Sequence, residues 1–273
     1  MNPEDWAARN PFTNQYAREE ASFYGLAEYE NDGMRVHTDT PVGRLDDYLN
    51  LAFSAGNINT PILTIDGSLW MSLTRMECQS QHLPIQFADG RVGTVGLGLG
   101  HFTLRAMEKP SVDTVLVYER DPRIIAFFKD AFKDRAGFDK VVFIEGDARK
   151  TCQGEALDFL YVDCYPTCCG DEVITDIELF IENNDLYNGP DSYHFWGMER
   201  ALLDAVMLGM LDFSDLDWPT QKYFGRWAGT PVEGVAGGHL LKHLYRTVLD
   251  PGFISDVLSR LGYSVGEPTG GEE

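Results

Sequence analysis

The sequence predicts an α/β fold built on a doubly wound parallel sheet, and two observations lead to that prediction. First, short apolar runs at residues 91–95, 114–118, 140–144 and 157–162 alternate with helix-like segments, the pattern of parallel strands joined by helices. Second, the first run ends in glycines and the other three end on or beside a carboxylate. Because ligands of open parallel sheets bind beyond the carboxyl ends of the strands, this order predicts one nucleoside-binding edge.

The first run leads into the sequence Gly96-Leu97-Gly98-Leu99-Gly100. A tight turn from strand to helix requires positive φ angles, which glycine adopts without steric cost. The missing side chains also let backbone N–H groups approach a ligand at the start of the helix. We therefore expect Gly96, Leu97, Gly98 and Gly100 to border a cofactor.

Acidic residues follow the later runs at positions that suit an adenosyl ligand. Glu119 lies 19 residues after Gly100, near the roughly 20 expected for an acid that binds ribose hydroxyls. Asp147 follows the third run, where a carboxylate can accept a hydrogen bond from an adenine amino group. Arg120 and Ala148 adjoin these two acids, and Asp163 ends the fourth run. The prediction is a Rossmann-like sheet with a single cofactor site.

These segments resemble motifs of class I S-adenosylmethionine-dependent methyltransferases. The resembling stretches are VGLGLGH (95–101), LVYERDP (116–122), IEGDA (144–148) and LDFLYVDCYP (157–166). Together with DGSLWMSLTRMECQSQ (66–81), the glycine segment looks most like the spermidine-synthase-like branch. The resemblance covers about residues 93–166 and is weaker in the flanks. It implies S-adenosylmethionine as the cofactor.

The resemblance also implies roles for individual residues. Glu119 would hold the ribose, Asp147 the adenine amino group, and Asp163 would lie near the sulfonium. Glu77, 19 residues before Gly96, is the counterpart of a family glutamate near the methionine end of the cofactor, or else a solvated helix carboxylate. One departure from the family pattern is Thr94, which stands where many members carry an acid.

The implied reaction is methyl transfer to a small-molecule or peptidic acceptor. The sulfonium methyl is already electrophilic, so the protein mainly has to provide an in-line approach and remove the acceptor's proton. Asp163, Tyr165 and His194 are the candidates for these catalytic tasks. Aminopropyltransferases carry a second aspartate where this chain has Pro166, which argues against aminopropyl transfer.

Three alternatives stay open. One is a different reaction of the same cofactor, either aminopropyl transfer or cleavage of the sulfonium. Another is a non-catalytic binding or assembly protein on a methyltransferase scaffold. The third is a nicotinamide-dependent dehydrogenase, whose fingerprint requires a small residue where this chain has His101 or Thr103.

We expect three parts: an N-terminal extension (1–88) with a helical arm and a β-hairpin, the cofactor-binding core (89–200), and a helical C-terminal part (201–273). The arm (1–33) either packs on the core or covers a ligand. Residues 61–65 and 68–71 flank Asp66-Gly67, a strong hairpin signal. A helix is expected at 75–81 that ends near Pro84. Trp70 and Met71 are interpreted as core residues.

The predictions for the later segments are as follows. Asp121 is expected to cap a helix whose first residue is Pro122. A short fifth strand is expected at 193–196. Helices are expected at 44–55, 171–183, 198–211, 239–249 and 251–261, and a long loop or lid at 212–237.

Composition excludes some partners. The chain has 273 residues, 44% of them hydrophobic, and a formal net charge of −21, which disfavours nucleic acid because phosphate contacts need clustered Lys and Arg. No run approaches the roughly 18 apolar residues of a membrane span. The five cysteines match no disulfide framework or common zinc pattern, so we expect no metal and a reducing, cytoplasmic setting. A homodimer is left open.

Overall fold

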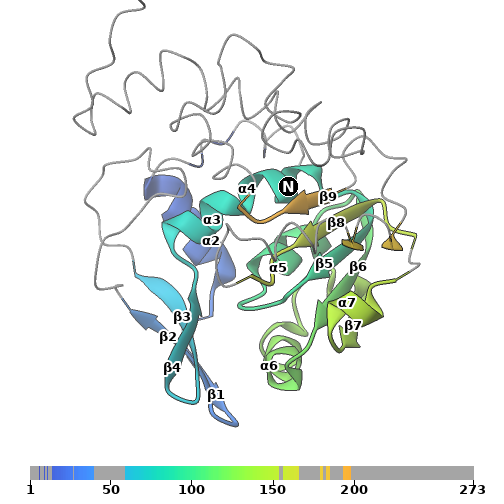
Figure 1. Ribbon diagram of the computed structural model, residues 1–273. Coiled ribbons are helices and arrows are strands. Elements are labelled where there is room, and N and C mark those ends of the chain that lie inside the picture. Colours follow the sequence, from blue (N-terminus) through green and yellow to red (C-terminus); the bar gives the residue numbers. More distant parts are fainter. Residues whose placement is uncertain are drawn as a thin grey trace, which may run out of the picture.

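The structure is a computed structural model that describes residues 6, 9, 11, 14–26, 28–39, 59–153, 156–165, 179–180, 183–184 and 193–197 (Figure 1). The predictions for residues 44–55 and 201–273, for Pro166, and for most of 171–183 lie outside these residues. The three-part division of the chain stays a prediction.

A five-stranded parallel sheet forms the core of the described chain (Figure 1). Its strands are β5 (Gly90–Val95), β6 (Val112–Glu119), β7 (Val141–Glu145), β8 (Phe159–Val162) and β9 (Tyr193–Phe195). They lie in the order β7-β6-β5-β8-β9, and every neighbouring pair is parallel. Strand order reverses between β5 and β8, which is the topological switch point of a doubly wound sheet. The predicted fold class is confirmed, including the fifth strand.

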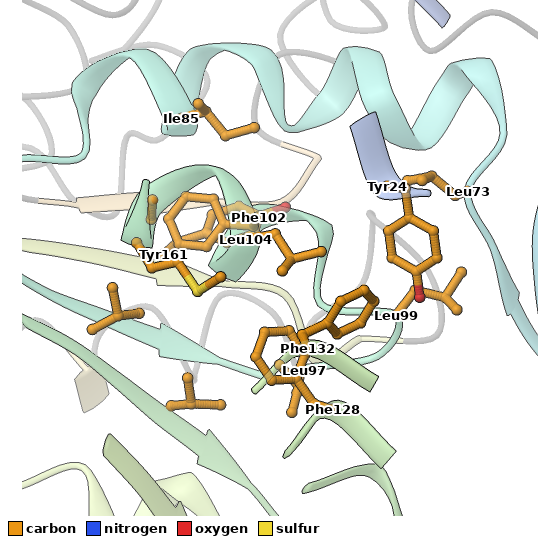
Figure 2. Close-up of a cluster of buried hydrophobic side chains, with 14 of the residues drawn as sticks. Tyr24, Leu73, Ile85, Leu97, Leu99, Phe102, Leu104, Phe128, Phe132 and Tyr161 are labelled. Atoms are coloured by element: carbon orange, nitrogen blue, oxygen red, sulfur yellow. The ribbon is translucent and has the colours of Figure 1, made fainter. Parts of the chain in front are cut away.

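Short helices connect these strands: α5 (His101–Met107), α6 (Pro122–Phe132), the 3₁₀ turn η1 (Phe138–Lys140) and α7 (Ala148–Thr151). Asp121 caps α6 as predicted, because its side chain accepts a 2.9 Å hydrogen bond from the Arg123 backbone N–H and Pro122 follows. The apolar stripe of α6 packs Phe128 against Phe132, with ring centroids 5.1 Å apart. Figure 2 shows these two rings beside Leu97 and Leu99 of the glycine segment.

The N-terminal part adds an antiparallel sheet in the order β1-β2-β3-β4, which lies beside the parallel sheet (Figure 1). Its strands are β1 (Glu28–Asn31), β2 (Met34–Asp39), β3 (Thr60–Ile65) and β4 (Ser68–Ser72). The hairpin predicted around Asp66-Gly67 is confirmed. A second hairpin, with Asp32-Gly33 at its turn, pairs β1 with β2 and was not predicted.

Three helices complete the described part: α2 (Asn14–Tyr24), α3 (Arg75–Ser80) and α4 (His82–Phe87). The helix predicted at 75–81 is confirmed as α3, but Pro84 does not end it, because Pro84 lies in the first turn of α4. Proline is tolerated there, since backbone N–H groups of a first turn have no partner within the helix. In the described residues, α2 packs on the core and α3 rather than standing apart.

Buried charge anchors α2 to the parallel domain. Glu20 is fully buried, and its two oxygens accept 2.8 Å hydrogen bonds from Nε and Nη2 of Arg105 on α5. Nε2 of His101 lies 2.8 Å from Glu20 Oε2, and Nη1 of Arg9 lies 2.5 Å from Glu20 Oε1. Burial alone would raise the pKa of Glu20, but His101 and Arg105 outweigh it and hold the pKa at about 2. Glu20 is therefore ionised at neutral pH.

Gly96 sits at the point where β5 and β8 meet the glycine segment. Its φ angle is 87°, in the left-handed region, and a Cβ atom there would overlap the backbone carbonyl oxygen of Asp163. Backbone atoms cannot swing aside as a flexible side chain can. Gly96 thus allows the ends of β5 and β8 to approach each other closely.

We predict that Gly96→Ala destabilises the fold by about 3 kcal/mol or more, because it adds backbone overlap to left-handed strain. The matched control is Gly67→Ala, where φ is 78° but a Cβ atom would meet nothing within 4 Å. Strain alone should cost that variant about 1–2 kcal/mol. Urea denaturation of both variants measures the difference, and equal losses would contradict the close approach at Gly96.

Candidate functional site

One cavity of about 610 Å³ opens at the carboxyl ends of β5, β6 and β8. Its size is typical of small-molecule sites, which span roughly 300–1,000 Å³. The residues that the sequence proposed for the cofactor all line it, and so do two of the three candidates for catalysis, Asp163 and Tyr165. The full set is Glu77, Gly96, Leu97, Gly98, Gly100, Glu119, Arg120, Asp147, Ala148, Asp163 and Tyr165. The cavity thus lies at the switch point, where ligands of this fold class bind.

Glu119 ends β6 and is buried at the cavity wall. Its Oε2 accepts a 2.9 Å hydrogen bond from the Leu97 backbone N–H, and its Oε1 accepts one of 2.9 Å from the Asp121 backbone N–H. A carboxylate offers about four lone-pair sites, so each oxygen can accept a further hydrogen bond. Glu119 can therefore hold the glycine segment and bind hydroxyl groups at the same time.

Asp147 lies at the tip of β7, on the same side of the cavity as Glu119. It caps α7, because Oδ1 accepts a 3.2 Å hydrogen bond from the Arg149 backbone N–H. Its side chain is 43% exposed. The capping bond uses only part of the carboxylate, which leaves acceptor capacity toward the cavity.

Two carboxylates, those of the buried Glu77 and the partly buried Asp163, lie near each other at the other part of the cavity. Burial, and then the Asp163 carboxylate, raises the pKa of Glu77 well above its usual value. Burial likewise raises the pKa of Asp163 to about 6, against the opposing effect of a 3.1 Å hydrogen bond from the Tyr161 hydroxyl. Two neighbouring carboxylates out of water resist being ionised together. This part of the cavity therefore favours either a shared proton or a cationic ligand.

The two other catalytic candidates differ in position. Tyr165 lines the cavity, two residues beyond Asp163. His194 lies in β9, fully buried, with its ring 5.9 Å from that of Tyr161, and it is not among the residues lining the cavity. Burial lowers the pKa of His194 to about 3. The structure therefore places Tyr165 at the cavity, whereas His194 lies outside the cavity lining.

Several lining residues were not found from the sequence. Met71 packs against the core as expected, and it also lines the cavity, where its Sδ accepts a 3.0 Å hydrogen bond from the Leu99 backbone N–H. Trp70 is 51% exposed beside the cavity, so its assignment to the core is wrong. The remaining aromatic lining residues are Phe102, Tyr118, Tyr161, Phe180 and Trp196. No local pattern marks them, because they come together only through the tertiary fold.

The described residues contain neither a candidate metal site nor a candidate membrane-spanning helix. In this part of the chain, no three His, Cys, Asp or Glu side chains are grouped so that they could hold a metal ion. None of its helices has the length and apolar character needed to cross a membrane. Two of the five cysteines, Cys168 and Cys169, lie outside the described residues.

Comparisons with known proteins find distant structural similarity and no sequence match. No protein-family model matches the sequence, and no curated protein matches it. Among solved structures, spermidine synthase from Thermotoga maritima matches 62% of this chain and 55% of its own, with 13% identity and a TM-score of 0.38. A probable spermidine synthase from Corynebacterium glutamicum matches 62% of this chain and 63% of its own, with 14% identity and a TM-score of 0.39.

A methyltransferase from Podospora anserina, solved with bound SAH, matches 45% of this chain and 59% of its own, with 21% identity and a TM-score of 0.30. The matches thus span little more than half the length of these solved chains. With TM-scores this low, the fold class rests on the strand order and not on the likenesses. The fold is a Rossmann-like, doubly wound parallel sheet.

The raised pKa of Asp163 predicts a pH-dependent stability. A carboxyl group whose pKa rises from 3.8 to about 6 on folding binds its proton more tightly in the folded state. The free energy of unfolding therefore falls as pH rises from about 4 to about 6, and the loss is complete above that range. Asp163→Asn should be more stable than the wild type by about 1–3 kcal/mol at pH 8, and equally stable at pH 4.

Urea denaturation between pH 4 and pH 8 measures this difference. The matched control is Asp113→Asn, which changes an exposed aspartate of β6. Its free energy of unfolding should stay within about 0.5 kcal/mol of the wild type at every pH. A gap between Asp163→Asn and the wild type that does not change with pH would show that Asp163 ionises normally.

Proposed function

We propose that the chain binds S-adenosylmethionine in this cavity and transfers its methyl group to a small-molecule or peptidic acceptor. The observation that supports this most is the convergence on one cavity of the glycine segment, Glu119, Asp147 and Asp163 from four different strand ends. These residues are spread over positions 96–163 of the sequence, and the parallel sheet brings them together. A nucleoside with a charged tail fits a cavity with this distribution of acceptors.

In this proposal each part of the cavity binds one part of the cofactor. Backbone groups of the segment from Gly96 to Gly100 border the methionine portion. Glu119 accepts from the ribose hydroxyls, and Asp147 accepts from the adenine amino group. Glu77 and Asp163 face the sulfonium. A positive charge there relieves the repulsion between these two carboxylates.

The chain's own residues then position the acceptor and take its proton. Asp163 is the best-supported proton acceptor, because its pKa of about 6 lies close to physiological pH and its side chain lines the cavity. Tyr165 lies beside it and would orient the acceptor. His194, as a neutral ring behind the lining, would act on the site only through the packing of Tyr161. The methyl group is electrophilic when the cofactor is bound, so alignment is the main requirement.

Aminopropyl transfer from a related adenosyl cofactor is the second candidate. The observation that favours it is the carboxylate pair of Glu77 and Asp163, which suits an amine acceptor as well as a sulfonium. Both reactions would use the same residues. The identity of the sulfur-containing product distinguishes them.

The test combines binding and product analysis. Calorimetry should detect binding of S-adenosylmethionine to the protein and no binding of NAD. Mass spectrometry of the small molecules that copurify with the protein should then guide the choice of acceptors. Formation of S-adenosylhomocysteine with a methylated acceptor supports methyl transfer, whereas methylthioadenosine supports the second candidate. Absence of S-adenosylmethionine binding at millimolar concentration would refute the proposal.

Glu119 supplies a test at a single residue. Glu119→Ala should weaken S-adenosylmethionine binding by about 1.5–3 kcal/mol, or roughly 10- to 150-fold in Kd, as expected for lost hydrogen bonds to a charged group. Glu119→Gln keeps one oxygen acceptor, so its affinity for S-adenosylmethionine should fall by less. Calorimetry on both variants, with circular dichroism as the check on folding, measures the effect. An unchanged affinity in Glu119→Ala would remove Glu119 from the site.

A further inference from the structure

Trp70 occupies an irregular position in β4. The register of β3 and β4 pairs Leu63 with Met71 and Thr64 with Leu69, so Trp70 is an extra residue with no residue opposite it on β3. An extra residue of this kind is a β-bulge, which bends the strand and can re-aim a side chain. β4 lies at the edge of the sheet order β1-β2-β3-β4, so the bulge interrupts the hydrogen bonds to one neighbouring strand only.

The bulge decides which side chains of β4 reach the cavity. In a regular strand, successive side chains point to opposite faces of the sheet. Here Trp70 and Met71 are consecutive and both line the cavity, whereas Leu69 is not among the lining residues. Trp70 is 51% exposed in this position. The irregularity of β4 thus places a large indole ring at the cavity, where a bound ligand would cover it.

Two contacts fix the course of β4 along the cavity. At the hairpin tip, Oδ2 of Asp66 accepts a 3.1 Å hydrogen bond from Nη1 of Arg123, in the first turn of α6. Toward the other end of β4, Sδ of Met71 accepts a 3.0 Å hydrogen bond from the Leu99 backbone N–H. Trp70 lies between these two anchors and adjoins the second. It therefore borders the part of the cavity beside the glycine segment.

The charge of the nearby cavity wall is negative. Among the described lining residues, those within 70–81 and 161–165 include the carboxylates of Glu77 and Asp163 and no lysine or arginine. Both arginines of the described lining follow the other strand ends, those of β6 and β7. The face of an aromatic ring attracts a cation within about 6 Å, and indole does so most strongly. Trp70 and the two carboxylates therefore suit a positively charged group.

We propose that the ring face of Trp70 binds the sulfonium of S-adenosylmethionine and so makes the site prefer this charged cofactor over its neutral product, S-adenosylhomocysteine. This inference rests on the proposed function, because the cation it names belongs to the proposed cofactor. Trp70 is a specificity-determining residue that contacts the cofactor and takes no proton. When the methyl group has left, the sulfur is a neutral thioether, and the loss of its attraction to the ring favours release of the product.

Calorimetry with the two ligands tests the proposal. Trp70→Leu keeps an apolar side chain and removes the ring, so it should weaken binding of S-adenosylmethionine by about 5- to 30-fold and that of S-adenosylhomocysteine by no more than about threefold. The matched control is Leu69→Ala, which changes an exposed residue of the same strand outside the cavity lining. Both affinities of the control should stay within about twofold of the wild type.

A second measurement changes the charge distribution of the ring and keeps its shape nearly the same. Full-length protein is produced with tryptophan that carries an increasing number of ring fluorines, which withdraw negative charge from the ring faces. The affinity for S-adenosylmethionine should fall stepwise along this series, and the affinity for S-adenosylhomocysteine should stay constant. The same series in Trp70→Phe, where four of the five tryptophans remain, should show no stepwise fall.

The outcomes separate this inference from the proposed function. A wild-type protein that binds neither ligand would refute both. A wild type that binds S-adenosylmethionine, with equal losses for the two ligands or no loss in Trp70→Leu, would overturn the role of Trp70 alone. A stepwise fall that persists in Trp70→Phe would assign the effect to another ring and would also overturn it. Circular dichroism, together with retained binding of S-adenosylhomocysteine, shows that Trp70→Leu is folded.

Discussion

The carboxylate of Glu119 holds together the parts of the site, and the rest of the cavity depends on it. By accepting from the backbone N–H groups of Leu97 and Asp121, it ties the end of β5 to the end of β6. Gly96 permits the same strand end to approach β8 on its other side. The glycine segment is thus fixed between two neighbouring strands. A loop held in this way presents a preformed surface to a ligand, which reduces the ordering cost of binding.

Much of this arrangement could be predicted because its signals are local. Each strand of the parallel core is a short apolar run, and the residue that ends it is also the residue at the ligand edge. Glu119, Asp147 and Asp163 were found in this way, since strand ends in a parallel sheet lie on one edge regardless of the details of packing. The turn at Asp66-Gly67 is equally local, because both residues adopt positive φ angles.

Other features could not be predicted because their signals are weak or distant. Strand β1 (Glu28–Asn31) is polar and mostly exposed, so no alternation of apolar residues marks it, and the Asp32-Gly33 turn beside it was overlooked. The role of Glu20 depends on Arg105 and His101, more than 80 residues away in the sequence. Trp70 follows an ordinary hairpin turn, and only the tertiary fold places it at the cavity. Long-range contacts of this kind leave no spacing rule in a single sequence.

The carboxylates of Glu20, Glu77 and Asp163 fall into two groups that differ in how their charge is balanced. Glu20 is surrounded by Arg9, Arg105 and His101, and the last two hold its pKa low, so its charge is compensated within the fold. For Glu77 and Asp163, no ion pair is found among the described residues, and burial raises the pKa of both. Apolar residues of similar size would cost less free energy at those two positions. The uncompensated pair faces the cavity, so the missing positive charge is one that a ligand can supply. The proposal of a cationic cofactor therefore rests on that difference in compensation more than on the glycine segment itself.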